Sequence, residues 1–482
     1  MNLRIISRIL GVLLMLFSLT QLAPVGVAWY YQENIHHIFL LAFGLTFLSG
    51  AAFWLPNAKQ KGELRTRDGF LITALFWLVL SLFGALPFML SAAPHLSLTD
   101  AFFESVSGLT TTGATVITGL DALPRSILYY RQQLQWLGGI GIVVIAVAIL
   151  PMLGIGGMQL YKAETTGPMK DSKLTPRITS TAKALFTIYL LMTIACAACY
   201  WLAGMGLFDA IAHSMSTVAT GGFSTHDASM GYFASDAIKC VAIAFMFIGS
   251  INFSLHFIAW QHGKAGHYLN NPEYVFYALV LSIASILISI VLAATQTLSL
   301  HDSVINGMFQ AVSFASTTGF QTHDYSAWPG PLPWLLLLLG FMGGCGSSTA
   351  GGIKVVRVLL IFKQGLRELK QLIHPNAVFL LKLGAHTVSD RVIMAVWSFF
   401  SVYVLLFIAM MLLLLASGLD FVTAFSTVGS AISNVGPAAG EASSNWASLN
   451  DFAKWALALT MITGRLEIFT VLVLLSPAFW RR

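Results

Sequence analysis

Ten apolar runs along the sequence are each long enough to cross a lipid bilayer as a helix. A membrane-spanning helix needs about 20 consecutive, mostly apolar residues. Charged residues make up only 10% of the chain, far below the roughly 25% of soluble domains and too few to cover a water-facing surface. We therefore expect an all-α polytopic membrane protein. The predicted spans are residues 4–30, 36–56, 69–92, 130–155, 182–204, 237–261, 273–295, 332–362, 390–416 and 451–476.

Shorter apolar stretches lie between some of these spans, at residues 98–110, 205–219, 302–316 and 420–433. They are too short to cross a bilayer. Irregular backbone survives at membrane depth only where protein buries it or where it lines a water-filled cavity. We therefore expect four re-entrant segments, each a short helix that enters the membrane and turns back through a loop.

The basic residues are distributed unevenly between the predicted loops. With the N-terminus inside, all but five of the 26 Lys and Arg residues lie in cytoplasmic segments, as the positive-inside rule requires. Both termini are thus predicted to be cytoplasmic. The same placement accounts for the net charge of +6 without a nucleic-acid partner. The five exceptions are Arg125, Arg131, Lys239 and Lys454, predicted outside, and Arg465, within the last span.

A fourfold internal repeat organises most of the chain. The segments DAFFESVSGLTTTG, FDAIAHSMSTVATG, NGMFQAVSFASTTG and TAFSTVGSAISNVG align on Gly113, Gly221, Gly319 and Gly436, at intervals of 108, 98 and 117 residues. Each unit reads as a span, a short helix, a Gly-bearing loop and a second span. We expect two N-terminal spans in residues 1–60, then repeats at 61–160, 161–265, 266–375 and 376–482.

The loops carry the residues that a cation filter needs. Potassium-channel filters replace the ion's water with rings of backbone carbonyls. Glycine lets consecutive carbonyls turn toward one axis, Thr adds a hydroxyl oxygen, and each short helix would aim its partially negative C-terminus at the ion. One such loop is equally typical of a helix end or turn, but four at equivalent places predict a pseudo-tetrameric cation pore. The candidate filter residues are Thr111, Thr112, Gly113, Ala219, Thr220, Gly221, Thr317, Thr318, Gly319, Asn434, Val435 and Gly436.

The motifs around these loops resemble the Trk/Ktr/HKT superfamily of potassium transporters. They read TTTGATV, VATGGFST, ASTTGFQTH and SNVGPA. The two extra N-terminal spans, the Gly-rich stretch 340–352 and the overall length are similar to the TrkH/TrkG group of bacterial Trk-system membrane subunits. The resemblance implies K⁺ as the transported ion, a location in the bacterial inner membrane, a homodimer of two separate pores, and a cytosolic nucleotide-binding regulatory subunit of the TrkA kind. Plant members that prefer Na⁺ place Ser where this chain has Gly113, so glycine in all four loops favours K⁺.

The predicted span 332–362 is interrupted by a glycine-rich stretch, GFMGGCGSSTAGG. Glycine costs about 1 kcal/mol per residue in a helix interior relative to Ala, so we expect a polar, non-helical loop that crosses the pore below the filter and acts as its gate. The family resemblance points the same way. The alternative is close helix packing through the GxxxG of Gly340 and Gly344. The candidate gate residues are Gly343, Gly344, Gly346, Ser347, Ser348, Thr349, Gly351 and Gly352.

Arg465 lies near the middle of the last predicted span. A charge at that depth costs several kcal/mol unless it is paired or faces water, and on a helix Glu467 would point elsewhere. One reading is structural, with Arg465 in a buried ion pair or hydrogen-bonded to filter or gate carbonyls. The other reading is a fixed positive charge in the pore, which limits cation residence or holds the gate shut. The family resemblance places the matching arginine beside the gate loop and favours the second reading.

The remaining ionisable residues suggest no catalytic chemistry. Glu104, near the start of the first short helix, suits the positive helix end and is predicted to be structural. We expect a transport protein rather than an enzyme, with no organic cofactor and with the lipid bilayer as its surroundings. The rival function is a K⁺ symporter coupled to H⁺ or Na⁺, which would need titratable residues deep in the spans. The external acidic residues Asp121, Asp227, Asp324 and Glu441 are expected to belong to solvated loops, and the alternative is that they concentrate cations at the pore mouth.

Overall fold

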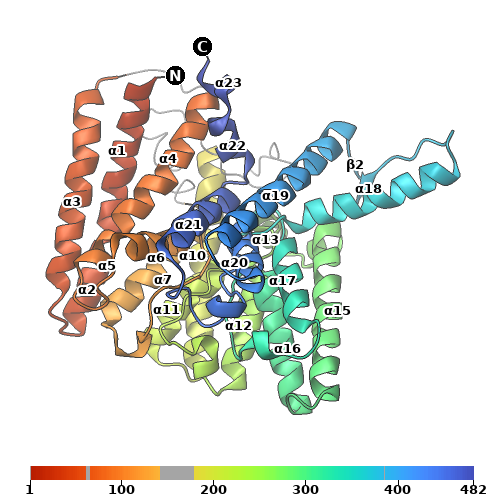
Figure 1. Ribbon diagram of the computed structural model, residues 1–482, viewed down its shortest axis with the longest axis horizontal. Coiled ribbons are helices and arrows are strands. Elements are labelled where there is room, and N and C mark those ends of the chain that lie inside the picture. Colours follow the sequence, from red (N-terminus) through yellow and green to blue (C-terminus); the bar gives the residue numbers. More distant parts are fainter. Residues whose placement is uncertain (1, 61–65, 140, 142–177, 385, 482) are drawn as a thin grey trace.

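The fold is almost entirely helical, as predicted. The computed structural model describes residues 2–60, 66–139, 141, 178–384 and 386–481. Its helices stand side by side in a broad bundle, with both ends of the chain at one side (Figure 1). The described strands, β1 (Lys382–Leu383) and β2 (His386–Thr387), are each two residues long and pair antiparallel.

The N-terminal spans form one edge of the molecule (Figure 1). Helices α1 (Leu3–Thr20) and α2 (Leu22–Tyr30) make up the first span, and α3 (His36–Trp54) the second, followed by the 3₁₀ turn η1 (Leu55–Asn57). The inner face of α1 packs into the core that it shares with α4, the first helix of the first repeat.

Each repeat starts with a long helix and continues into a short one. The long helices are α4 (Thr66–Gly84, extended by α5, Leu86–Leu90), α10 (Ile178–Leu202), α15 (Pro272–Ala294) and α19 (Asp390–Ala416). The short helices coincide with the predicted re-entrant stretches, which are confirmed as helices; they are α6 (Leu98–Leu109), α11 (Leu207–Val218), α16 (Leu300–Ala315) and α20 (Phe421–Ser433).

The short helices lie inside the bundle, and the long helices face outward. Almost all of α6 and α20 is buried, whereas only 17% of the most apolar part of α19 and 33% of that of α15 are covered by protein. Apolar surface on this scale has no place in water. The lipid bilayer therefore covers the long helices, and the short helices with their loops lie at membrane depth within the protein.

The second helix of each of the last three repeats is broken, which the sequence predicted only for the third. Helices α12 (Asp236–Gly249) and α13 (Phe253–His262) meet at 94°, and α21 (Asp451–Arg465) and α22 (Phe469–Leu475) at 114°. The expectation of continuous spans at 237–261 and 451–476 was therefore wrong. In the third repeat α17 (Leu332–Met342) and α18 (Val355–Ile373) are separated by residues 343–354.

Local backbone chemistry produces these breaks. The Asn252 side chain accepts a hydrogen bond from the Ser254 amide at 2.8 Å and so begins a new helix at Phe253. At the other break Glu467 and Ile468 adopt left-handed conformations, with φ of 55° and 50°. These conformations are unfavourable for residues with a side chain, so the surrounding packing must hold them.

The described helices that are long and apolar enough to span a membrane account for eight of the ten predicted spans when each bent pair counts as one. The interrupted run 332–362 is the ninth. The tenth, 130–155, begins in α7 (Arg125–Gly139), and most of its remainder lies outside the described residues, as does the boundary predicted near residue 160.

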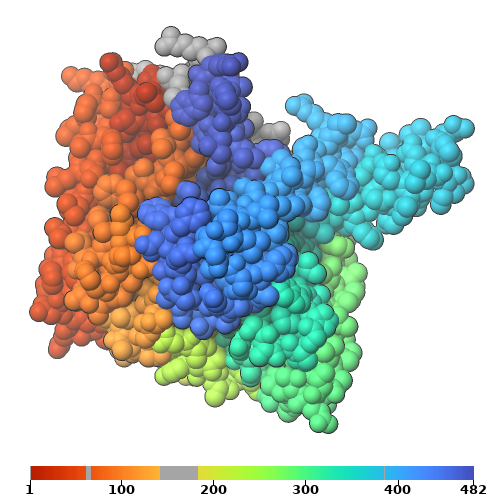
Figure 2. Space-filling view, in the orientation of Figure 1, coloured from red at the N-terminus to blue at the C-terminus, as the bar shows by residue number. Residues whose placement is uncertain are grey.

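Short elements complete each repeat. A 3₁₀ turn begins four to seven residues after the ring glycine of every loop: η2 (Leu120–Ala122), η4 (Ser229–Tyr232), η5 (Tyr325–Ala327) and η6 (Gly440–Ala442). Helix α14 (Gly266–Leu269) leads into the third repeat, and α23 (Pro477–Trp480) ends the chain. Helix α18 and the β-hairpin project from the body as an arm (Figure 2). The exposed apolar residues of α18 include Phe362, Leu369 and Leu372.

Candidate functional site

The four Gly-bearing loops share one backbone conformation. In each loop a residue with a left-handed φ of 52–55° is followed two positions later by a glycine with φ of 77–102°. A residue with φ above zero is uncommon unless it is glycine, so four matching pairs mark a repeated structure. The pairs are Thr111 with Gly113, Thr220 with Gly222, Thr317 with Gly319, and Asn434 with Gly436.

This register corrects the alignment of the second repeat by one residue. The loop residue before each glycine donates its amide to the carbonyl of the serine five residues earlier, as Thr112 does to Ser107 at 2.9 Å. Gly221 makes this bond to Ser216 at 2.8 Å. Gly221 therefore corresponds to Thr112, and Gly222, which the sequence alignment missed, corresponds to Gly113. The shared Gly-Phe dipeptides at 222–223 and 319–320 were the available signal.

The four glycines close the loops into a ring. A Cβ atom on Gly113 would overlap the carbonyl oxygen of Gly221 in the next repeat. The same relation holds for each following repeat, and the last returns to the first. The overlapping pairs are Gly222 with the Thr318 oxygen, Gly319 with the Val435 oxygen, and Gly436 with the Thr112 oxygen. The loops of all four repeats therefore meet around one axis, at a spacing that only glycine permits.

A small cavity of about 80 Å³ lies on the side of the ring that carries the 3₁₀ turns. Its lining includes all four glycines of the ring, Gly113, Gly222, Gly319 and Gly436. Main-chain hydrogen bonds between repeats support its wall. The Trp446 amide donates to the Thr115 oxygen at 2.8 Å, and the Gly231 amide to the Gln321 oxygen at 3.0 Å.

The glycine-rich segment between α17 and α18 lies against the other side of the ring. Residues 343–354 are non-helical, as predicted, and we call them the cross-loop. Because α17 ends at Met342, Gly344 is not on a helix, so the GxxxG alternative was wrong. The Thr349 hydroxyl donates to the oxygens of Val218 at 3.1 Å and Gly249 at 3.0 Å.

The cross-loop contacts the loops of the second, third and fourth repeats directly. Thr220 Oγ1 donates to Thr349 Oγ1 at 3.2 Å, and the Gly351 amide donates to Thr317 Oγ1 at 2.6 Å. The Gly352 amide donates to the Ser433 oxygen at 2.9 Å. Thr220 and Thr317 thus turn their hydroxyls toward the cross-loop.

The other predicted gate residues hold the cross-loop to the break between α12 and α13. The Ser347 oxygen accepts the Phe253 amide at 3.0 Å, and the Ser348 hydroxyl donates to the Cys345 oxygen at 2.6 Å. A Cβ on Gly344 would lie 3.0 Å from the Ser250 oxygen, and Gly343 has a φ of 71°.

Arg465, at the end of α21, joins the first repeat to the cross-loop. Its Nη1 donates to Thr111 Oγ1 at 3.0 Å and to the Thr349 oxygen at 2.8 Å. Its Nη2 donates to the oxygens of Gly138 and Gly139, at 2.7 and 3.0 Å. Hydrogen bonds to gate and filter groups, one of the two readings of this residue, are therefore present, and they leave the charge directly beside the cross-loop.

A carboxylate that the sequence did not single out anchors the cross-loop from α15. Glu273 Oε1 accepts the amides of Gly346 at 2.7 Å and Val356 at 3.1 Å, so one side chain binds both ends of the segment. Glu273 follows Pro272 at a helix start, where an acidic residue is ordinary, and nothing in the sequence links it to residues some 70 positions later.

Two further cations lie buried near the end of the cross-loop. Lys354 Nζ donates to the Ala350 oxygen, and Arg357 pairs with Glu467 at 2.9 Å over the ring of Phe399. A buried charge must be paired or hydrogen-bonded to be tolerated. The sequence analysis placed both residues in a cytoplasmic segment and did not predict their buried contacts.

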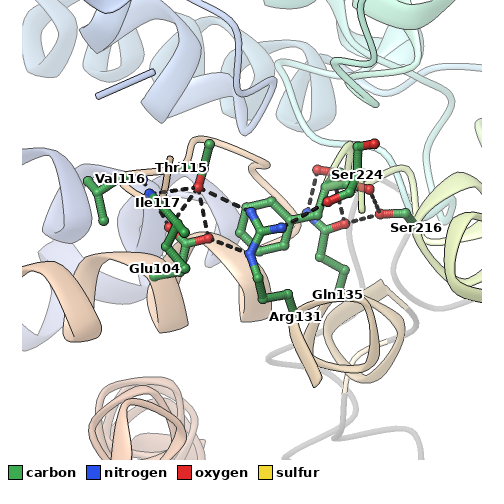
Figure 3. Close-up of polar contacts among 10 residues, drawn as sticks. Glu104, Thr115, Val116, Ile117, Arg131, Gln135, Ser216 and Ser224 are labelled. Atoms are coloured by element: carbon green, nitrogen blue, oxygen red, sulfur yellow. Dashed lines mark hydrogen bonds and ion pairs between the residues drawn. The ribbon is translucent and has the colours of Figure 1, made fainter. Parts of the chain in front are cut away.

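Charged side chains also connect the first and second repeats on the cavity side. The Asp227 carboxylate accepts the Gly119 amide at 3.0 Å, and His226 bonds to Asp121. Arg131, predicted to be an external loop charge, is instead fully buried and paired with Glu104 at 2.9 Å (Figure 3). Glu104 is the seventh residue of α6, so its predicted place at the positive start of that helix was wrong, and its ion-pair partner was missed.

Fold and site together define a class: a polytopic membrane protein in which four repeats bring their re-entrant loops to one axis lined by backbone oxygens. The comparisons give the particular family. A sequence profile named TrkH and described as a cation transport protein matches residues 35–482. The chain belongs to this family.

Relatives of known identity match the chain from end to end. The Trk system potassium uptake protein TrkH of Halomonas elongata is 56% identical over 482 residues, and that of Escherichia coli K12 is 51% identical, each match covering 100% of both chains. The crystal structure of the potassium transporter TrkH from Vibrio parahaemolyticus superposes with a TM-score of 0.91 at 50% identity, again covering 100% of both chains.

Proposed function

We propose that this protein conducts K⁺ into the bacterial cell through a channel-like pore whose selectivity filter is the ring of four loops. The closed ring is the observation that carries the proposal. Each glycine faces the carbonyl oxygen of the next repeat, and all four glycines line one cavity. A ring of oxygens on a common axis can replace the hydration shell of a monovalent cation. The relatives' names, potassium uptake protein and potassium transporter, supply the identity of the ion.

The proposed filter comprises the predicted residues together with Gly222. Carbonyl oxygens would supply most of the ligands, because every loop has them whatever its side chains. Because the ligands are backbone carbonyls, the fourth loop can contribute to the filter although Asn434 and Val435 stand where the first loop has Thr111 and Thr112. The short helices end at the ring, so the partially negative ends of their dipoles would stabilise the ion there.

The cross-loop is the proposed gate, and Arg465 is its proposed latch, the residue whose hydrogen bond holds the cross-loop closed. Its hydrogen bonds to the loops of three repeats, and the bond from Arg465 to Thr349, support a position across the ion path. A positive charge at that point also repels a cation leaving the filter. Flux would then require the cross-loop to move away from the ring.

Assembly and location follow the Trk systems to which the relatives belong. We assign the chain to the bacterial inner membrane as a homodimer of two pores, with both termini cytoplasmic and a TrkA-like nucleotide-binding subunit on the cytosolic side. Two observations support placing both termini on the same side of the membrane. Both ends of the chain lie together (Figure 1), and Arg67 Nη1 donates to the Arg481 oxygen at 3.0 Å. Helix α18 carries basic residues, including Lys363, Arg367 and Lys370, and projects from the body as an arm (Figure 2), which suits docking of a cytosolic partner.

Ion flux into proteoliposomes tests the proposal and its rival. The purified protein is reconstituted, and uptake of K⁺ and Na⁺ is measured under an imposed membrane potential, with and without a proton gradient. A channel-like pore predicts K⁺ uptake that follows the potential, exceeds Na⁺ uptake at least tenfold and ignores the proton gradient. Uptake that needs a H⁺ or Na⁺ gradient would instead support the coupled symporter, and equal K⁺ and Na⁺ uptake would contradict the filter.

A further inference from the structure

Arg131 is a positive charge at the mouth of the proposed cation filter. It extends from α7, is fully buried, and lines the same cavity as the four glycines of the ring. A fixed positive charge there raises the energy of a cation entering the ring. Its presence calls for a second charge that cancels it.

Glu104 supplies that charge. Its carboxylate lies on α6, is fully buried, and accepts Arg131 Nε at 2.9 Å. It also accepts the Thr115 hydroxyl at 3.0 Å and the Val116 amide at 3.0 Å, both from the segment that leaves the first loop (Figure 3). The lone pairs of the carboxylate are thus directed at protein donors, so Glu104 is placed as a counter-charge rather than as an ion ligand.

The guanidinium of Arg131 also bonds to both neighbouring loops. Nη2 donates to Thr115 Oγ1 of the first repeat at 3.1 Å, and the remaining contacts are with the second repeat. Nη1 donates to the Ser224 oxygen at 2.9 Å, and the guanidinium carbon lies 4.2 Å from the centre of the Phe223 ring. Figure 3 shows Arg131 between Glu104 and Thr115 on one side and Ser224 on the other. One turn further along α7, Gln135 Nε2 donates to the Gly221 oxygen at 2.6 Å. Arg131 therefore links the loops of two repeats directly beside the ring.

The corrected register shows that the ion pair is peculiar to the first repeat. Counting nine residues back from each ring glycine places His213, Gln310 and Thr427 where the first repeat has Glu104. All four side chains are buried. His213 Nε2 bonds to Ser224 Oγ at 3.0 Å, much as Glu104 bonds to Thr115. In the first two repeats this position ties the short helix to its loop, whereas the Thr427 hydroxyl bonds to Thr423 and Ala424 within α20. Only in the first repeat is it a carboxylate, and there it meets an arginine.

We infer that Glu104 and Arg131 set the electrostatic balance of the filter mouth: Arg131 positions the first and second loops, and Glu104 cancels its charge so that K⁺ can enter. Both are positioning residues for ion binding. The inference rests on the proposed function and adds to it a pair of residues that determines ion affinity without touching the ion.

Binding of K⁺ to the purified full-length protein tests the inference. Binding is measured as the rise in melting temperature with KCl at constant ionic strength, since a ligand that binds only the folded state stabilises it. Glu104→Gln leaves the Arg131 charge alone beside the mouth. A unit charge roughly 10 Å from the ion at an effective dielectric of about 20 raises the half-saturating K⁺ concentration on the order of tenfold. Adding Arg131→Gln to this variant removes both charges and should return the value to within about threefold of wild type.

Recovery in the double variant separates a charge balance from a merely structural role. A structural role predicts that the double variant binds K⁺ as weakly as Glu104→Gln or more weakly, and that result would overturn the inference. If Glu104→Gln does not accumulate in membranes, Arg131→Gln is compared with the double variant. Arg131→Gln, in which Glu104 keeps its charge without a partner, should then bind K⁺ more tightly than the double variant does. Equal K⁺ affinities of these two variants would overturn the inference.

Tyr130→Phe is the matched control. Tyr130 neighbours Arg131 on α7 and is equally buried, but its hydroxyl donates to the Gly84 oxygen at 2.9 Å and it does not line the cavity. Its loss should leave K⁺ affinity unchanged. A wild-type protein with no K⁺ preference would contradict the proposed function itself. A K⁺-selective wild type in which Glu104→Gln has normal affinity would contradict only the inference.

Discussion

The ring glycines are the residues whose substitution should be most damaging. Gly222→Ala places a methyl group at a φ of 82° and against the Thr318 oxygen of the next repeat. The left-handed conformation alone costs about 1–2 kcal/mol, and the overlap must also push two loops apart. We expect K⁺ uptake in proteoliposomes to fall at least tenfold and the preference for K⁺ over Na⁺ to be lost.

Gly119→Ala provides the control for Gly222. Gly119 has a similar φ of 72°, but no atom lies within 4 Å of its added Cβ. Gly119→Ala should pay only the backbone cost of about 1–2 kcal/mol and keep the preference for K⁺ over Na⁺. Equal selectivity in both variants would show that the contact between repeats does not matter.

Removing Arg465 should release the proposed gate. Arg465→Ala deletes the bonds to Thr349, Thr111, Gly138 and Gly139 and a positive charge beside the ion path. We expect Rb⁺ uptake several-fold above wild type in cells with equal protein in the membrane. Arg465→Lys keeps the charge but not the planar fork of donors, so its uptake should be intermediate. Wild-type uptake in Arg465→Ala would rule out the latch.

His226 should make the outer loops sensitive to pH. Burial lowers its pKa, but the carboxylates of Asp209 and Asp121 outweigh burial and raise the pKa above its ordinary 6.5, and His213 is stacked beside it. The hydrogen bond from His226 likewise lowers the pKa of Asp121 below 3.8. A raised histidine pKa contributes stability that is complete below about pH 6.5 and is lost as the pH rises through the folded-state value.

Melting curves of wild type and His226→Gln check this dependence. The wild-type melting temperature should fall more steeply between about pH 6 and pH 8, because only wild type loses the charge that binds Asp121 and Asp209. The difference should be small, since half of the Asp121 side chain is exposed and solvent screens the pair. Parallel curves would contradict the assignment.

At the scale of elements, the cross-loop is the part whose removal should change flux without changing selectivity. Deleting residues 347–349 shortens it and removes the Thr349 bonds to Val218 and Gly249. We expect K⁺ uptake to rise and the ratio of K⁺ to Na⁺ uptake to stay constant, because the ring lies on another segment. Thr349→Val, which loses the hydroxyl and keeps the loop length, should raise uptake less. A folded deletion variant with unchanged or lower uptake would contradict the gate.

The sequence predicted the long and short helices because length and apolar composition encode them directly. The cross-loop was predictable for the same kind of reason, since five glycines in ten residues disfavour a helix. The breaks after Gly249 and Arg465 were not, because apolar residues continue across them and each break is held by distant groups, such as the Cys345 amide on the Ser250 oxygen at 2.9 Å. A single residue pattern cannot report a contact 95 positions away.

The candidate site was predictable in outline and not in register. Gly113, Gly319 and Gly436 stand alone, so their alignment is unambiguous, but the Gly221-Gly222 doublet offers two phases. The Gly-Phe dipeptide at 222–223 favours Gly222, and the backbone hydrogen bond from Gly221 to Ser216 decides for it. Likewise, Arg131 looked like a loop charge because its partner Glu104 lies 27 residues earlier on another helix.

At the scale of the whole molecule, the long helices face outward toward the bilayer and the short helices face inward and position the loops. The long helices bury only part of their apolar surface against protein, so the bilayer completes their environment. The short helices are enclosed and carry the four loops to the axis. One chain thereby builds a fourfold ring of loops, which in the proposed function surrounds a monovalent cation, and its repeats differ from one another, as Glu104 and Asn434 show.

Ion density at the ring tests the central claim most directly. Crystals of the protein grown in RbCl can be examined for anomalous scattering, since Rb⁺ is close to K⁺ in size. A fourfold filter predicts an anomalous peak on the axis between the carbonyl oxygens of Thr112, Gly221, Thr318 and Val435, and K⁺ but not Na⁺ should displace it. Rb⁺ peaks only elsewhere in the protein, or equal displacement by Na⁺, would contradict a K⁺-selective filter at this ring.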